Sequence, residues 1–358
     1  MILTFFGDVA AQKFSRRQIE NIDPELKSSN LIIADLAYPI LSKKLKPKRF
    51  TLSPIFCSTQ TIELLQKMNV DVVSYCTNHS FDFSKEGMNE TYYHLKKAGI
   101  KYFGSGDNLE ELKKPLLIEK EDQKLALISF SWPVIGGVPA TKTKAGILEL
   151  KWSNIVSVID NIKNLYPDFL IAVFFHWNYE LEAYPQPYHR KIARKCIDMG
   201  VDLIIGNHTH RFGPIETYRD KLIIYSLGNW FHPPFNIGDF KLRFPSVSLK
   251  HCAVSVEING KQIKKIILSH HVWDSDDESL KHVLREKLDS KKSKYLINNL
   301  AMESYDMWFE KNRVKNKLLP IYYQNESECS ILLKNLFLKL RTSIIDLLHY
   351  FRLKSGPS

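Results

Sequence analysis

Short apolar runs recur along the chain, and most of them end in polar residues. The runs ILTFF, NLIIA, VDVVSYC, FLIAVFF, VDLII and KLIIYSL are followed, in that order, by Gly7-Asp8, Asp35, Thr77-Asn78-His79, His176-Trp177, Gly206-Asn207-His208 and Gly228-Asn229. Apolar runs this short, rich in Ile, Val and Phe and bounded by turn residues, are typical of buried strands. We therefore predict a strand at each run.

Helical patterns separate these runs. Residues 59–69, 86–98 and 187–199 have helical periodicity, and the last two stop at Gly99 and Gly200, where a glycine C-cap is expected. Alternating strands and helices indicate an α/β fold. Functional groups of such folds collect at the carboxyl ends of the strands. The polar residues that follow the apolar runs are therefore predicted to share one edge.

The pattern changes towards the C-terminus. Two alternating runs around Asn259-Gly260 predict a β-hairpin. After about residue 275 the sequence becomes charged and helical in character, so we predict a domain at 1–275 and a helical, basic extension at 276–358.

An amphipathic helix is predicted at 331–353. Its apolar stripe consists of Leu333, Leu336, Phe337, Leu340, Ile344, Leu347, Leu348 and Phe351. Basic residues dominate the rest of the segment, and such a helix can lie on an anionic membrane surface. Docking on the protein's own core, or pairing with another protomer, are the alternatives.

Charge and composition narrow the class of protein. The 358 residues carry a formal net charge of +11, which favours an anionic partner such as a phosphate ester, an acidic polymer or a membrane surface. We expect no nucleic-acid partner, because the sequence has no standard nucleic-acid-binding module. The five cysteines have wide spacings and no C-x-x-C, which argues against disulfides and structural zinc.

The chain's location can be predicted from its N-terminus and hydropathy. The opening MILTFFGDVAAQKF has no basic region followed by a long apolar stretch, and no segment reaches eighteen uncharged apolar residues. We expect a cytoplasmic protein without signal peptide or transmembrane helix, peripheral on the inner membrane if 331–353 binds lipid.

Four histidines follow strands at the predicted edge: His79, His176, His208 and His210. Two histidines one residue apart can point both rings at one ion, although H-x-H alone is weak evidence. Asp8, Asp35 and Asn78 at neighbouring strand ends add oxygen ligands. A mixed set of imidazole, carboxylate and amide ligands suits a divalent ion that takes part in hydrolysis.

The order of these residues resembles calcineurin-like metallophosphoesterases and, more narrowly, the CapA family of bacterial capsule and poly-γ-glutamate synthesis proteins. The resemblance covers about residues 1–275. It rests on Gly7-Asp8, CTNHSFDFSKEGMNETYYHLKKAGIKYFGSG at 76–106, HWNYELEAYPQPYHRKIARKCIDMGVDLIIGNHTHRFGPIE at 176–216 and IIYSLGNWF at 223–231. It implies a four-layer α/β/β/α sandwich, followed here by the helical appendage.

The resemblance also implies a role for each residue of the site. Asp8 and His210 would bind one ion, and Asn78, His176 and His208 the other, with His79 as general acid or transition-state donor. Residues that support the ligands or contact substrate would be Asp82, Glu180, Glu216 and Asn229. The cofactor would be one or two divalent ions of Mn, Fe or Zn.

The chain departs from the family pattern at three positions. Ala10 stands where phosphoesterases have the histidine of Asp-x-His, and Ala37 stands where the family has a glutamate. Asp35 lies two residues before Ala37, on the same strand face, and could replace the missing acid as the bridging carboxylate. Asn178 replaces the glycine of His-Trp-Gly and is expected to alter the pocket wall only.

Two functions follow from these patterns. The first is a metal-dependent, phosphoesterase-like hydrolase in the biosynthesis or remodelling of a capsular polysaccharide or poly-γ-glutamate-type polymer. Its substrate would be an anionic polymer or a phosphorylated or lipid-linked glycan. The second is a non-catalytic polymer-binding or assembly subunit of that machinery, which the two alanines favour. The two functions can be distinguished by the geometry of the site. The hydrolase requires the proposed ligands to converge and, above all, Asp35 to point into the site.

Overall fold

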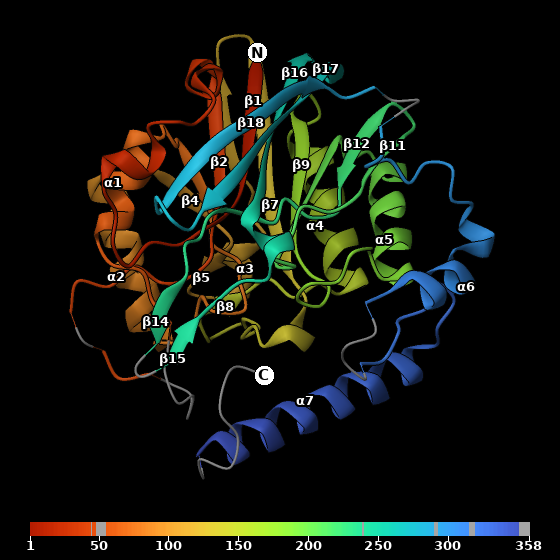
Figure 1. Cartoon of the computed structure of the whole chain (residues 1–358). Helices are drawn as coiled ribbons and strands as arrows, with labels where there is room; N and C mark the ends of the chain where they lie inside the picture. The colour runs from red at the N-terminus through yellow and green to blue at the C-terminus, as the bar shows by residue number, and fades with distance from the viewer. Residues whose placement is uncertain (44, 48–54, 238–239, 290–292, 315–318, 351–358) are drawn as a thin grey trace.

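Figure 1 shows the computed structural model of the chain, with two β-sheets in the centre and helices outside them. The structure describes residues 1–358 except 44, 48–54, 238–239, 290–292, 315–318 and 351–358. Apolar side chains of both sheets, such as Phe5, Leu31 and Phe174, form one cluster between the sheets. The inner faces of the sheets therefore pack against each other and form the centre of the molecule.

The first sheet has eight strands and is centred on the N-terminal run. Its path is β18 (Ser279–Lys287), β17 (Gln262–Asp274), β16 (Lys250–Asn259), β1 (Ile2–Val9), β2 (Leu31–Leu36), β3 (Val72–Ser74) and β4 (Lys101–Phe103). A short strand, β13 (Asn229–Phe231), pairs in parallel with the end of β1. The carboxyl ends of β1, β2, β3 and β13 lie at one edge because these strands are parallel.

The second sheet has six strands. Their order is β11 (Ile215–Tyr218), β12 (Lys221–Ile224), β10 (Leu203–Asn207), β9 (Leu170–His176), β7 (Gln123–Ser131) and β6 (Leu116–Lys120). The central strands β7, β9, β10 and β12 are parallel and almost entirely apolar, which is the expected composition of strands covered on both faces.

Two further hydrophobic clusters, one for each sheet, join the sheets to their helices. Leu64 and Leu65 of α1 (Gln60–Lys67) and Met88 and Leu95 of α2 (Ser84–Lys97) pack against the first sheet. Helices α4 (Trp152–Leu165) and α5 (Pro187–Asp198) cover the second sheet. These layers confirm the predicted α/β/β/α sandwich. The remaining elements of the sandwich are short: α3 (Leu109–Leu112), the pair β5 (Ser105–Gly106) and β8 (Gly146–Ile147), the pair β14 (Phe235–Ile237) and β15 (Phe240–Leu242), and the 3-10 helices η1 (Arg16–Ile19), η2 (Pro24–Ser28), η3 (Pro133–Ile135) and η4 (Ser246–Leu249).

The predicted hairpin around Asn259-Gly260 is confirmed as β16 and β17. The segment after residue 275 differs from the expectation, because it begins with the strand β18 and not with a helix. β18 pairs with β17 from Ile267 onward, so the first sheet continues to Lys287. Cross-strand pairing, which a charged sequence does not reveal, determines this element. The division into two domains stays a prediction.

The C-terminal segment contains two helices, α6 (Met302–Asn312) and α7 (Glu328–Tyr350). α7 confirms most of the amphipathic helix predicted at 331–353, and residues 351–353, including Phe351, lie outside the described residues. The described members of the predicted apolar stripe are exposed, so α7 does not dock on the protein's core through this stripe. Leu338 and Ile345, on the opposite side of α7, are buried instead. None of the described helices has the length and apolar character needed to span a bilayer.

Candidate metal centre

The first sheet presents a row of polar side chains at the carboxyl ends of its strands. β1 lies between β13 and β2, and the register places Asp8 opposite Asn229 on one side and opposite Asp35 on the other. Asp8 and Asn229 are 0% exposed and Asp35 is 2% exposed. Three polar side chains therefore lie on neighbouring strands inside the protein.

A close backbone approach produces this register. The strand β1 is irregular between Phe6 and Asp8, and the amide N–H of Asp8 donates to the carbonyl oxygen of Gly228 at 2.8 Å. A Cβ atom on Gly7 would lie 1.9 Å from that carbonyl oxygen. Only glycine fits at position 7, and the contact brings Asp8 and Asn229 side by side.

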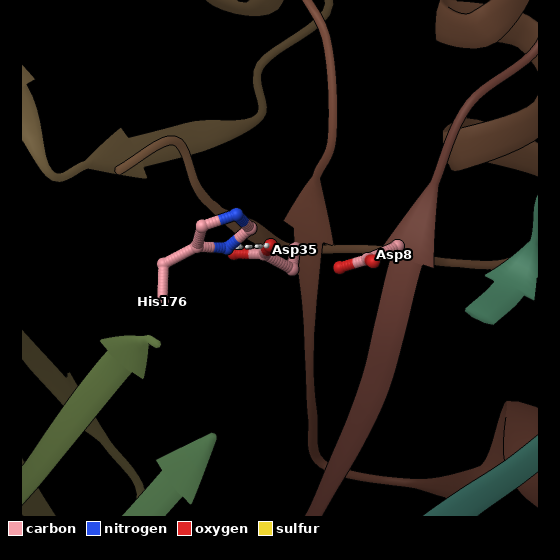
Figure 2. Close-up of side chains that lie close together, drawn as sticks. All are labelled: Asp8, Asp35 and His176. Atoms are coloured by element: carbon pink, nitrogen blue, oxygen red, sulfur yellow. Dashed lines mark ion pairs between the residues drawn. The ribbon is translucent and has the colours of Figure 1, made fainter. Parts of the chain in front are cut away.

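The second sheet contributes a histidine that reaches across to the first. His176 ends β9, and its Nδ1 lies 3.4 Å from Oδ2 of Asp35. Its Nε2 lies 3.0 Å from Oδ1 of Asn78, which follows β3. Figure 2 shows the imidazole of His176 pointing at Asp35, with Asp8 on the adjacent strand. The site is therefore built between the two sheets, at their common edge.

The loop after β10 brings in the paired histidines. His208 and His210 have positive φ angles of 94° and 56°, which non-glycine residues rarely adopt. The hydroxyl of Thr209 holds the loop between them by donating to Oγ of Ser226 at 2.7 Å. Strained backbone of this kind persists where surrounding contacts determine it, and it is frequent at functional sites.

The two rings of this loop point to different members of the site. The ring centroids of His208 and His176 are 4.8 Å apart. Nδ1 of His210 lies 2.9 Å from Oδ1 of Asn229 and 3.1 Å from Oδ2 of Asp8. The structure thus places His208 beside His176, and His210 beside Asp8. These are the two groups to which the family resemblance assigns separate ions.

Donor atoms of three residues are close enough to share an ion. Ligand atoms of Asp8, Asp35 and His176 all lie within 4.8 Å of one another. Among the described residues, no hydrogen bond reaches either oxygen of Asp8, Oδ2 of Asp35 or Nδ1 of His176, although these atoms are buried. Buried carboxylate oxygens that accept no hydrogen bond are costly for a protein alone, and a divalent cation would satisfy them. The residues present therefore fit a metal of the borderline N/O class.

The electrostatics of the two carboxylates differ. Burial, with a further contribution from the charge of Asp8, raises the pKa of Asp35 to about 6, although His176 opposes the shift. Burial also acts on Asp8, but the imidazole of His210, whose Nδ1 lies 3.1 Å from Oδ2 of Asp8, outweighs it and lowers the pKa of Asp8. His210 responds in the opposite sense: burial opposes its charged form, yet Asp8 raises the pKa of His210 to about 9.

His79 is more exposed than His176 and His210. Its Nδ1 is 2.7 Å from Oδ2 of Asp82, and its side chain is 27% exposed. The ring of Tyr38 packs edge-on against it, with centroids 4.8 Å apart. The Asp82 carboxylate and the Tyr38 ring fix the orientation of the imidazole and leave Nε2 available to other groups.

The positions of Glu180 and Glu216 differ. Glu180 is exposed and follows the His176 loop, and its charge contributes to the raised pKa of His210. Glu216 is not brought to the centre. It is fully buried and paired with Arg190 and Arg194 of α5. The strand β11 turns this carboxylate toward the helix layer, so the structure gives Glu216 a different environment from the predicted one.

The three departures from the family pattern have structural counterparts. Ala10 and Ala37 are buried and offer no ligand atom, whereas Asp35 points into the site. Asn178 has a φ of 71°, a conformation that glycine adopts freely and asparagine tolerates. Its side chain donates to the carbonyl oxygen of Tyr184 and so holds the loop beyond β9.

Two residues of the site were not singled out from the sequence. His232 is buried beside His210, with ring centroids 5.6 Å apart, and its Nε2 lies 3.1 Å from the hydroxyl of Tyr38. Both residues follow strands at the same edge, β13 and β2 respectively. The position of His232 and Tyr38 shortly after a strand is the feature of the sequence that could have identified them as site residues.

Two curated relatives are similar to this chain in sequence. The capsule biosynthesis protein CapA of Bacillus anthracis is 26% identical over 214 residues, which are 59% of this chain and 52% of the relative. The PGA biosynthesis protein CapA of Bacillus subtilis (strain 168) is 26% identical over 231 residues, which are 64% of this chain and 60% of the relative. The match thus spans between half and two thirds of the length of these relatives.

Among solved structures, a 5′-nucleotidase precursor from Thermus thermophilus aligns with 78% of this chain and 56% of its own. The sequence identity of that pair is 11% and the TM-score is 0.45.

The family profile described as bacterial capsule synthesis protein PGA_cap matches residues 3–233, which include every residue of the centre described above. The chain therefore belongs to the bacterial capsule synthesis protein family PGA_cap.

Proposed function

We propose that the protein is a metal-dependent hydrolase that cleaves phosphoester bonds during synthesis or remodelling of an anionic capsular polysaccharide or poly-γ-glutamate-type polymer. The observation that carries this proposal is the convergence of Asp8, Asp35 and His176 from two sheets, with buried carboxylate and imidazole atoms that make no hydrogen bond. Both CapA relatives have printed names that refer to capsule or PGA biosynthesis, which supports the choice of polymer.

Six residues would hold the ion or ions. Asp8 and His210 form one side of the centre, Asn78, His176 and His208 form the other, and Asp35 stands between them. When bound, a divalent ion polarises a phosphoryl oxygen and makes water more acidic. The protein's own contribution is to hold carboxylate and imidazole atoms in a buried site, where their interactions with charge are stronger than in water.

His79 is the proposed proton donor to the leaving oxygen. Asp82 accepts a hydrogen bond from Nδ1 of His79, which orients the ring so that Nε2 is the atom able to pass a proton outward. His79 is also more exposed than the buried His176 and His208, so a substrate oxygen can reach it. Proton transfer and metal binding are therefore assigned to different histidines.

This separation can be measured. We expect the wild-type protein to bind Mn²⁺ and to hydrolyse a p-nitrophenyl phosphodiester or monoester. His208→Ala should lose both metal affinity and hydrolysis. His79→Asn should retain Mn²⁺ affinity, measured by calorimetry, while hydrolysis falls by about 10²–10⁴-fold, the usual contribution of a positioned acid.

The same assay tests the non-catalytic role. If the wild type binds no Mn²⁺, Fe²⁺ or Zn²⁺ and hydrolyses neither ester at any pH, the hydrolase proposal fails. A binding or assembly role in polymer synthesis would then remain, a role that the buried Ala10 and Ala37 favour because they remove ligand atoms.

A further inference from the structure

Helix α7 presents a continuous apolar surface to solvent. Eight of its large side chains are between 37% and 68% exposed: Leu332, Leu333, Leu336, Phe337, Leu340, Ile344, Leu347 and Leu348. We call this set the α7 stripe. It runs for about 24 Å along the helix at 1.5 Å per residue. Exposed apolar patches of this extent on soluble proteins mark interaction surfaces.

The opposite side of α7 is anchored to the protein. Leu338 is 4% exposed and Ile345 is 7% exposed. Oδ1 of Asn335 accepts a hydrogen bond from the hydroxyl of Tyr322 at 2.7 Å, and Lys334 pairs with Glu326. The side of α7 with Leu338 and Ile345 therefore packs against the protein, and the α7 stripe on the other side faces solvent.

The shape of the α7 stripe favours a flat apolar partner. At about 100° of rotation per residue, its eight side chains span an arc of about 160°. A two-helix seam uses a narrower stripe, whereas a helix lying in a membrane interface buries a broad apolar face.

The charges beside the α7 stripe favour an anionic partner. Lys339 and Arg341 fall about 20° beyond its two borders on the same rotation, one on each side. The α7 stripe itself contains no acidic residue. The same rotation places Glu328 and Asp346 about 20° beyond Lys339, so the Arg341 border is the more basic of the two. Acidic lipid headgroups would complement that border, whereas a second α7 in antiparallel orientation would place another basic border against it. The net charge of +11 acts in the same direction.

We propose that α7 binds the surface of an anionic phospholipid membrane through the α7 stripe, with Lys339 and Arg341 at the level of the headgroups. α7 packs against η3, which follows the carboxyl end of β7, and Figure 1 shows α7 on the side of the molecule opposite to the N-terminus. The edge that holds Asp8, Asp35 and His176 lies on this same side of the sheets. Membrane binding therefore turns that edge toward the bilayer.

Vesicle co-sedimentation of the full chain tests the proposal without measuring hydrolysis, so its outcome is independent of the proposed function. We expect binding to vesicles of phosphatidylcholine with phosphatidylglycerol, weaker binding at high salt, and little binding to phosphatidylcholine alone. Leu340→Glu with Ile344→Glu, in the middle of the α7 stripe, should weaken binding at least about tenfold. Met307→Glu on α6, equally exposed at 64%, is the matched control and should bind as the wild type does.

The orientation has its own readout. Cys329 is the one exposed cysteine among the described residues, and it lies in the first turn of α7. A polarity-sensitive fluorophore on Cys329 should shift to the blue on anionic vesicles. The same fluorophore on Lys261→Cys, combined with Cys329→Ser, reports on the β16–β17 turn at the far end of the sheets and should not shift.

Several results would overturn the proposal. They are absence of wild-type binding to anionic vesicles, equal binding by the Leu340→Glu, Ile344→Glu variant, and a shift of both fluorophores. Light scattering identifies the competing occupant: a wild-type dimer that this variant converts to a monomer, without vesicle binding, would assign the α7 stripe to a second copy of the chain. Circular dichroism confirms that the variant is folded.

Discussion

Asp35→Asn is expected to lower the affinity for Mn²⁺ by about 100-fold or more and to remove phosphoester hydrolysis. Asparagine keeps the size of the side chain but loses the negative charge that stands between Asp8 and His176. Losing a residue that merely supports a metal ligand costs about 10- to 100-fold in affinity, so losing a central carboxylate should cost at least as much. Calorimetric titration with Mn²⁺ gives the affinity directly.

Thermal unfolding provides a second readout for this variant. Mn²⁺ should raise the melting temperature of the wild type, because a ligand that binds only the folded state stabilises it, and should leave that of Asp35→Asn unchanged. Asp202→Asn is the matched control, because Asp202 is also a buried aspartate but accepts a hydrogen bond from the amide of Ile171 outside the centre. It should lower stability and keep the response to Mn²⁺. Unaltered Mn²⁺ affinity in Asp35→Asn would exclude Asp35 as a ligand.

Glu216→Gln is expected to lower the free energy of unfolding by about 3–5 kcal/mol, the usual cost of leaving one partner of a buried ion pair uncompensated. Nη2 of Arg190 lies 2.7 Å from Oε1 of Glu216, and both side chains are 0% exposed. The hydroxyl of Tyr225 donates to the other oxygen at 2.5 Å. Urea unfolding of wild type and variant measures the difference.

The pH dependence of this difference has a defined sign. Burial alone would raise the pKa of Glu216, but the hydrogen bond and charge of Arg190 outweigh it, so the pKa lies below the ordinary value of 4.5. A carboxyl group with a lowered pKa stabilises the fold above its unfolded pKa and loses that contribution as the pH falls through its folded pKa. The gap between wild type and Glu216→Gln should therefore narrow on acidification below about pH 4.5.

Metal affinity separates this structural role from the role that the resemblance implied. We expect Mn²⁺ to bind folded Glu216→Gln as tightly as it binds the wild type. Glu180→Gln, an exposed carboxylate near His210, is the comparison and should leave stability almost unchanged. A loss of metal affinity in Glu216→Gln at a temperature where the variant is fully folded would return Glu216 to the site.

The position of a residue after a strand was the most informative signal in the sequence. It identified Asp8, Asp35, Asn78 and His176, because parallel strands bring their carboxyl ends to one edge whatever the details of packing. The same signal singled out His208 and His210, which the structure places beside His176 and Asp8. Glu216 was assigned by the resemblance and not by this signal. It lies within β11, and its carboxylate pairs with Arg190 in the helix layer.

Periodicity has a comparable limit in the C-terminal segment. The spacing of apolar residues predicts the helix and its broad apolar side, but not what that side contacts. In α7 the two residues Leu338 and Ile345 anchor the helix, and the broad side faces solvent. β18 was missed for a related reason: its strand geometry depends on hydrogen bonds to β17, not on an alternating pattern of its own.

The part of the chain that matches the family profile is shorter than the part that forms the first sheet. The family profile ends at residue 233, yet β16, β17 and β18 supply one flank of the first sheet, and β16 pairs directly with β1 from Ile2 to Phe5. The amide of Tyr322 also donates to the side chain of Gln186, in the loop beyond His176. A fragment cut at the homology boundary would lose β16 and expose the edge of β1 at Ile2–Phe5. Residues 3–233 therefore carry the centre but not the whole first sheet, and recombinant fragments should extend through α7.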